Sequence, residues 1–174
     1  MASIIRVDDL QDSGGNSIIS SDGSGTFSNN LGVANTPNFM AALTSNQSIS
    51  DNSNTKVQCD LELVDTDNAY DNSTNYRFTV PSGKGGKYFF FAQIRVGSTS
   101  DFDVAQIKFY VNGTEKAFAS IRNEHDECIY LMHLRDLSAG DYVELYFYQN
   151  QGGSITIHGN SSSVRTYFGG YKLI

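Results

Sequence analysis

The chain has 174 residues, of which 39% are hydrophobic and 18% charged, as expected for one soluble domain with a short appendage that folds without a disulfide or a metal. Twelve basic and nineteen acidic residues give a net charge of −7, which argues against nucleic acid as a partner because phosphate binding needs a surplus of Lys and Arg. No segment approaches the about 18 apolar residues of a membrane-spanning helix, and no apolar signal-peptide core follows the N-terminus. We therefore expect no membrane span and synthesis in the cytoplasm.

Composition also indicates the fold class. The chain contains 16 Gly and only 2 Pro, many Asn and Ser, and no sustained 3.6-residue apolar period, which predicts an all-β fold with short strands joined by turns. One of these turns is Asn112-Gly113, the strongest short hairpin signal. The two cysteines, Cys59 and Cys128, lie in alternating apolar runs that favour buried thiols, with a disulfide or metal ligation as the alternative.

Residues 1–36 consist of short apolar pieces separated by turn residues. Each piece is too short to bury a core, so disorder is one interpretation. Apolar residues nevertheless recur on every piece, and they would be buried if three copies wound together or if the segment docked on a larger assembly. We predict an N-terminal arm, ending at Pro37, that attaches the chain to its assembly or intertwines with other copies. The expected docking residues are Ile4, Ile5, Val7, Leu10, Ile18 and Phe27.

The run 87–96 is rich in aromatic residues, and it alternates strictly between two faces of a predicted strand. Because adjacent side chains of a strand point to opposite faces, Tyr88 and Phe90 share one face while Phe89 and Phe91 share the other. A single sandwich buries only the inner face of each sheet. The outer face is therefore expected to meet another copy of the chain.

A second row of aromatic residues lies in the run 142–148, where Val, Leu and Phe alternate with Tyr and Glu. Tyrosine is enriched at interfaces, because its ring buries area while its hydroxyl keeps a polar partner. A solvated face that happens to carry tyrosines is the alternative, and we favour self-association. The expected interface residues of both rows are Phe89, Phe91, Tyr110, Tyr142, Tyr146 and Tyr148.

Three pieces of sequence, in order and at domain scale, resemble the globular head of the first complement component and its relatives. They are 76–90, with Phe-Thr-Val-Pro followed by Gly-x-Tyr-x-Phe; 137–145, with Leu-x-x-Gly-Asp-x-Val-x-Leu; and 166–174, with Thr-x-Phe-x-Gly-Tyr. The resemblance implies a head of residues 37–174 with a ten-stranded antiparallel jelly-roll sandwich, related to tumour necrosis factor. It also implies assembly as a tight three-fold homotrimer.

The arm carries a resemblance of its own. Residues 3–8 and 15–26 are similar to amino-terminal segments of bacteriophage virion proteins, notably fibre-like proteins of marine phages. This implies a virion protein assembled in the host cytoplasm: a tail fibre, spike or capsid decoration that docks on other virion proteins through its arm. The head would then bind a host glycan or protein through the loops 98–103, 122–127 and 149–154. A trimeric adhesin or lectin-like module outside any virion is the alternative.

Sites for other chemistry are weak. The acidic segment offers calcium ligands at Asp65, Asp67 and Asp71, but it lacks the glycine and the distant bidentate glutamate of an EF-hand, so a solvated loop is favoured. Acids of the exposed loops, such as Asp101 with Asp103 or the acids of 124–127, would serve a polysaccharide depolymerase, although nothing selects these pairs. The three histidines form no zinc pattern. We expect no cofactor and no enzymatic activity.

Overall fold

The computed structural model describes residues 9–21, 27–29, 35–98 and 101–173. These residues contain strands and turns only, and among them no helix is long and apolar enough to cross a membrane. The predicted all-β fold is therefore confirmed. Contacts divide the chain into two compact units, Met1–Ala34 with residue 174 and Asn35–Leu173.

The first unit is a three-stranded antiparallel sheet in the order β1 (Asp9–Gln11), β2 (Ser17–Ser21), β3 (Phe27–Asn29). The carboxylate of Asp12 closes the β1–β2 turn by accepting hydrogen bonds from the backbone N–H groups of Gly14 and Asn16. Among the expected docking residues, Leu10 is exposed and Ile18 is half-buried. The side chain of Phe27 and the residues Ile4, Ile5 and Val7 lie outside the described residues, so the docking role stays a prediction.

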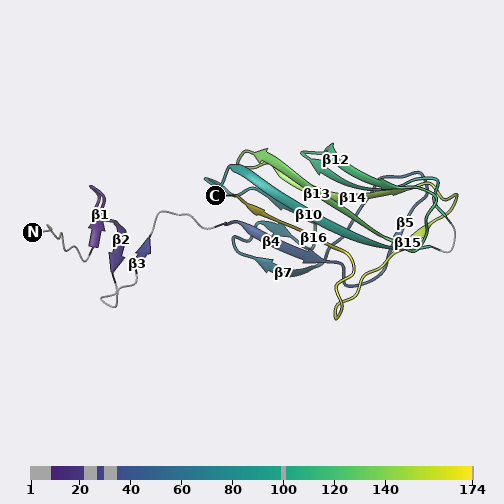
Figure 1. The fold of residues 1–174 in the computed structure, drawn as a ribbon, viewed down its shortest axis with the longest axis horizontal. Helices are drawn as coiled ribbons and strands as arrows, with labels where there is room; N and C mark the ends of the chain where they lie inside the picture. Colours follow the sequence, from purple (N-terminus) through teal and green to yellow (C-terminus); the bar gives the residue numbers. More distant parts are fainter. Residues whose placement is uncertain (1–8, 22–26, 30–34, 99–100, 174) are drawn as a thin grey trace, which may run out of the picture. The chain divides into compact units, whose positions relative to one another are not determined.

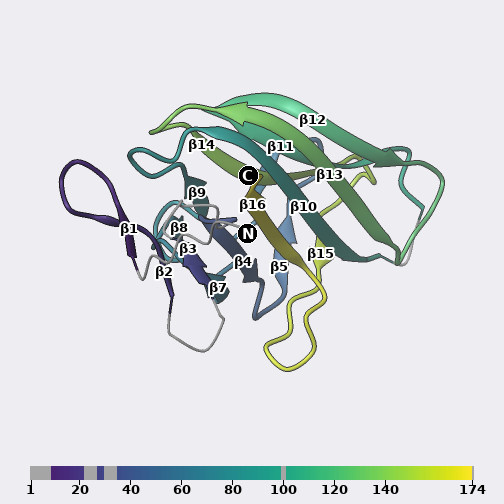
Figure 2. The ribbon, with the colours of Figure 1, turned by 60° about the vertical axis from the view of Figure 1, so that its left-hand side comes forward.

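The second unit, which we call the head, is a sandwich of two antiparallel sheets (Figures 1 and 2). The β10 sheet has the order β5 (Gln47–Ile49), β15 (Ile155–Ile157), β10 (Gly86–Gly97), β16 (Tyr167–Lys172), β4 (Asn38–Ala42), β7 (Leu61–Asp65), with β13 (Cys128–Leu137) also paired to β10. The β11 sheet has the order β12 (Thr114–Ile121), β11 (Ala105–Val111), β14 (Tyr142–Gln149), β9 (Arg77–Thr79), β8 (Tyr70–Asp71), with β6 (Thr55–Lys56) paired to β14. The expected count of ten strands is not confirmed, because several of these segments have only two or three residues.

The core between the sheets is built largely from aromatic rings. Phe39 stacks on Phe78 with ring centroids 4.7 Å apart, and it meets Phe168 edge-on at 4.9 Å. Phe168 in turn lies 5.5 Å from Phe109 and 6.2 Å from Phe90. Such offset and edge-on pairs add to the hydrophobic gain of burying large rings, so this cluster fixes the two sheets against each other.

Both local patterns predicted for the head are confirmed. Along β10 the residues facing the core are buried, whereas Phe89 and Phe91 are half-buried on the outer face. Asn112 and Gly113 both have positive φ, 51° and 75°, as a tight β11–β12 hairpin requires. Cys59 and Cys128 are free thiols, the first fully buried and the second half-buried.

Candidate functional site

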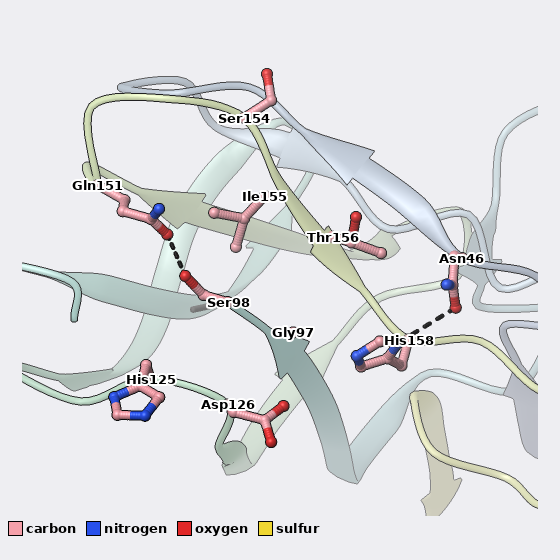
Figure 3. A pocket seen from close by; sticks show the side chains of 10 residues that line it. All are labelled: Asn46, Gly97, Ser98, His125, Asp126, Gln151, Ser154, Ile155, Thr156 and His158. Carbon is pink, nitrogen blue, oxygen red and sulfur yellow. Dashed lines mark hydrogen bonds between the residues drawn. The ribbon is translucent and has the colours of Figure 1, made fainter. Parts of the chain in front are cut away.

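The three loops predicted to bind a partner meet at one end of the head. The first follows β10, the second joins β12 to β13, and the third joins β14 to β15. Ser98, His125, Asp126, Gln151 and Ser154, which come from all three loops, line a pocket of about 790 Å³ that we call the loop-end pocket (Figure 3). The sequence predicted the exposed loops, but it held no signal that they converge.

Part of the lining of the loop-end pocket was missed by sequence reasoning. This part includes Asn46, Gly97, Thr156 and His158 (Figure 3). The imidazole of His158 lies directly over Gly97, where a Cβ atom would be only 2.2 Å from Nε2. The ring is held by Asn46, whose Oδ1 lies 3.3 Å from Nδ1 of His158. Asn46 and His158 are 112 residues apart in the chain, so no local pattern could have paired them.

The charges around the loop-end pocket are paired. The guanidinium of Arg95 donates to both the carboxylate and the backbone carbonyl of Asp126, with Nη2 2.8 Å from Oδ2. Nδ1 of His125 lies 2.6 Å from the carboxylate of Asp101. These two acids belong to the groups considered for a depolymerase, and each has a basic partner in the structure.

A buried polar residue shapes the third loop. Gln149 is fully buried at the end of β14. Its Nε2 donates to the carbonyl of Gly153 at 2.8 Å, and its Oε1 accepts from the N–H of Gln151 at 2.7 Å. Buried amides of this kind are costly unless they are satisfied. Gln149 therefore fixes the turn that places Gln151 at the pocket, where its amide oxygen accepts from the hydroxyl of Ser98.

The three weak calcium candidates have other roles in the structure. The carboxylate of Asp65 accepts hydrogen bonds from the backbone N–H groups of Ala69 and Tyr70, at 3.0 and 2.9 Å. Asp67 faces the ammonium of Lys84 at 3.7 Å, and Asp71 closes the turn that follows β8. Within the described ranges, no three acidic, His or Cys side chains are grouped to hold a metal ion. Asp65 and Asp71 thus cap turns, and Asp67 pairs with Lys84.

We expect Asp71→Ala to lower the stability of the head in a way that depends on pH. The N–H groups of Thr74 and Ser73 donate to the carboxylate at 2.8 and 3.1 Å, and they hold the pKa of Asp71 well below its usual value. Because water partly screens this carboxylate, the expected loss at neutral pH is about 0.5–1 kcal/mol. Since the folded pKa is depressed, the contribution is present above the unfolded pKa of about 3.9 and is lost as pH falls below it.

Urea unfolding of wild type and Asp71→Ala, at neutral pH and in steps down to about pH 2, measures the difference between their free energies of unfolding. The difference in the free energy of unfolding should narrow as the pH falls below about 3.9, because the unfolded state takes up the proton first. A difference that stays constant down to the lowest pH would show that the carboxylate is not the cause.

The six expected interface residues divide between the two sheets. Phe89 and Phe91 lie on the outer face of the β10 sheet, whereas the four tyrosines lie on the outer face of the β11 sheet. The tyrosines already have partners within the chain: the rings of Tyr110 and Tyr146 are 4.4 Å apart, and the guanidinium of Arg77 lies 4.2 Å from the ring of Tyr142. Their role between copies stays a prediction.

The outer face of the β10 sheet carries an uncovered apolar row that crosses five strands. Strand register places Met132, Phe91, Gly169, Met40 and Val64 side by side, on β13, β10, β16, β4 and β7. Met132 is 66% exposed and Val64 is 45% exposed. An apolar strip of this extent is unusual on a monomer surface and is typical of an interaction surface.

A second apolar row runs beside the first, and the two rows together favour this face as an interaction surface. It contains Leu134, Phe89 and Tyr171, on β13, β10 and β16. The alternation along 87–96 predicts the two phenylalanines of this face, whereas the residues of β13 were not among the expected interface residues. Their signal was present as Tyr130, Met132 and Leu134 at alternate positions of one strand, the pattern already used for β10.

Comparison with solved structures identifies the fold of the head. It is similar to mouse APRIL, with a TM-score of 0.59 and 12% identity, over 78% of this chain and 98% of that one. It is also similar to the globular domain of zebrafish complement 1qA, with a TM-score of 0.54 and 14% identity, over 79% and 98% of the two chains. The vertex protein of the phage PRD1 matches with a TM-score of 0.57 and 12% identity, over 79% and 95%.

These likenesses show that the head has the jelly-roll fold of tumour necrosis factor-like and complement heads. No family model matches the chain, and no curated protein matches it in sequence. At 12–14% identity the similarity extends to the fold alone.

Proposed function

We propose that the chain is a structural and adhesive component of a bacteriophage virion: a tail fibre, spike or capsid decoration protein. Three copies assemble through their heads, the N-terminal arm docks on other virion proteins, and the head loops bind the host surface. The protein acts by binding and not by catalysis. The resemblance of the arm to phage virion segments supports this proposal. So does the presence of a phage vertex protein among the structures that share the fold.

The observation that carries the adhesive role is the convergence of three loops on one polar pocket. Loops carried by a rigid sandwich are a common place for binding residues, because the scaffold fixes the loop ends while the loops vary. In this head hydrogen bonds tie the three loops together, between the side chains of Gln151 and Ser98 and from the N–H of Phe102 to the carbonyl of Glu124. The loop-end pocket is thus formed by the head itself and needs no second copy.

The apolar rows on the outer β10 sheet support assembly through the heads. A stable contact buries about 800 Å² on each partner, and a cyclic trimer forms when one surface patch repeatedly meets a different patch on the next copy. A groove of about 490 Å³ lies along this face, lined by Met40, Val64, Phe91 and Tyr171 among others. A side chain of a neighbouring copy would fill it. A trimer presents three copies of the loop-end pocket, so weak binding of the host surface by each pocket becomes strong binding by the whole trimer.

Light scattering coupled to size-exclusion chromatography tests the assembly of full-length protein and of a chain that starts at Asn38. The head is a separate compact unit, so it is expected to fold alone. We expect both proteins to be trimers. A monomeric truncated head would show that the arm, and not the β10 sheet, holds the copies together.

Antibodies raised against the head test the virion role on particles and cells of the source culture. We expect them to label purified particles, and we expect the chain that starts at Asn38 to be missing from particles when it replaces the full-length protein. Labelling of the cell envelope in place of particles would favour the alternative of a free adhesin.

A further inference from the structure

We infer that the loop-end pocket is a binding site for a neutral sugar, the uncharged pyranose units of a surface polysaccharide. This inference rests on the proposed adhesive function and gives its ligand a chemical class. It follows from three features of the pocket: the kind of groups that line it, the pairing of its charges, and the way one wall is held in place.

The groups that face the pocket are mostly neutral hydrogen-bonding groups. The amide of Gln151 accepts from Ser98 through its oxygen, which leaves its NH₂ group to donate. The amide oxygen of Asn46 is likewise used within the chain, and its NH₂ group remains. The hydroxyls of Ser154 and Thr156 each offer one donor and two acceptor positions. Amides and hydroxyls at several points around one space match the adjacent hydroxyl groups of a sugar ring.

The charges and the lining of the pocket disfavour anions, metal ions and apolar molecules as ligands. Of the lining residues, Asp126 is paired with Arg95, and His125 is engaged by Asp101. In the same loop the exposed acids Glu124 and Glu127 outnumber the exposed base Arg122, so phosphates and acidic sugars would be repelled. A metal ion lacks a ligand cluster in the described part of the chain. An apolar ligand would find only Ile155 among the lining residues as a large apolar side chain.

The ring of His158 packs closely on Gly97, which gives this side of the pocket a defined shape. Gly97 lies at the end of β10, in extended backbone that needs no glycine for its conformation. Its missing side chain is what allows the imidazole to lie on the strand, since a Cβ atom would be 2.2 Å from Nε2 and 2.8 Å from Cε1. With Nδ1 held near Asn46, the ring presents its edge and Nε2 at the pocket wall.

The matched pair of variants is Gly97→Ala and Gly85→Ala. The first inserts a methyl group where the His158 ring lies, so the ring must swing away from the wall. The second lies just before β10, at the end of that strand away from Gly97, and its new Cβ atom would meet no atom closer than the backbone oxygen of Leu137 at 3.4 Å. Thr156→Val serves as a further variant, because it removes one hydroxyl from the pocket at constant shape.

The experiment is saturation-transfer NMR on full-length protein with the methyl glycosides of glucose, galactose, mannose and N-acetylglucosamine, and with N-acetylneuraminic acid as the acidic probe. We expect at least one neutral glycoside to bind with a Kd of about 1–10 mM, and the acidic sugar to bind more weakly. Gly97→Ala should weaken binding about tenfold, Thr156→Val several-fold, and Gly85→Ala not at all.

Two results would overturn the inference: no neutral glycoside binds at about 50 mM, or Gly97→Ala and Thr156→Val both bind as wild type does. Adhesion of the same protein to host cells is measured in parallel. If the protein adheres to cells but no neutral glycoside binds, the adhesive function stands with a different ligand and the sugar site is excluded. If sugars bind but the protein neither adheres nor enters particles, the site stands and the proposed function fails.

Discussion

Replacing Met132 with glutamate is expected to convert the trimer into folded monomers at micromolar concentration. Met132 is the most exposed apolar side chain of the outer β10 sheet, and it lies beside Phe91 in the apolar row. If this row meets the next copy, the new carboxylate is buried without a partner in all three contacts of the ring. The cost is about 3 kcal/mol per contact, or more than a hundredfold in each association constant.

Light scattering at several protein concentrations measures this effect, with circular dichroism to show that the head stays folded. Phe118→Glu is the matched control, because Phe118 is 55% exposed on β12 of the other sheet and its substitution should leave the trimer intact. Tyr146→Glu places the same charge among the tyrosines. If Tyr146→Glu gives monomers while Met132→Glu remains trimeric, the contact lies on the β11 sheet and our assignment is wrong.

The tyrosines of 142–148 show which features of the fold can be predicted from the sequence and which cannot. Alternation along 142–148 predicts correctly that these side chains leave the core face, because a period of two is a property of any strand. It does not give their partners, which come from distant parts of the chain: Arg77 lies over Tyr142, and Asn52 accepts from the hydroxyl of Tyr148 at 3.0 Å. Pairing of distant strands decides these contacts, and no local pattern encodes it.

The loop-end pocket was predictable only in part for the same reason. Exposed polar loops can be recognised from turn residues between alternating runs. Their meeting depends on the sheet order, in which β15 pairs with both β10 and β5 and so brings His158 beside Gly97 and Asn46. Asn46 lies in a polar Ser- and Asn-rich stretch that carries no mark of a site.

The structure explains why the motif at 166–174 carries two adjacent glycines. Gly169 and Gly170 lie on β16 opposite Phe91 and Phe90 of β10. A Cβ atom on Gly170 would be 2.5 Å from Cδ1 of Phe90, and one on Gly169 would be 2.5 Å from Cζ of Phe91. Each glycine thus makes room for a large ring of the neighbouring strand, one in the core and one on the outer face.

Gly170→Ala is expected to destabilise the head by about 3 kcal/mol, at the upper end of overpacking effects. Phe90 cannot move aside, because its ring is fully buried and lies within 6.4 Å of the rings of Phe39, Phe109 and Phe168. Thermal unfolding at one fixed protein concentration should show a Tm lower by about 6–12 °C. Gly153→Ala should stay within about 0.5 kcal/mol of wild type, since its new Cβ atom meets no atom within 4 Å. Equal Tm values for Gly170→Ala and Gly153→Ala would show that the core has room beside Phe90, and that close ring packing is not why this strand carries glycine.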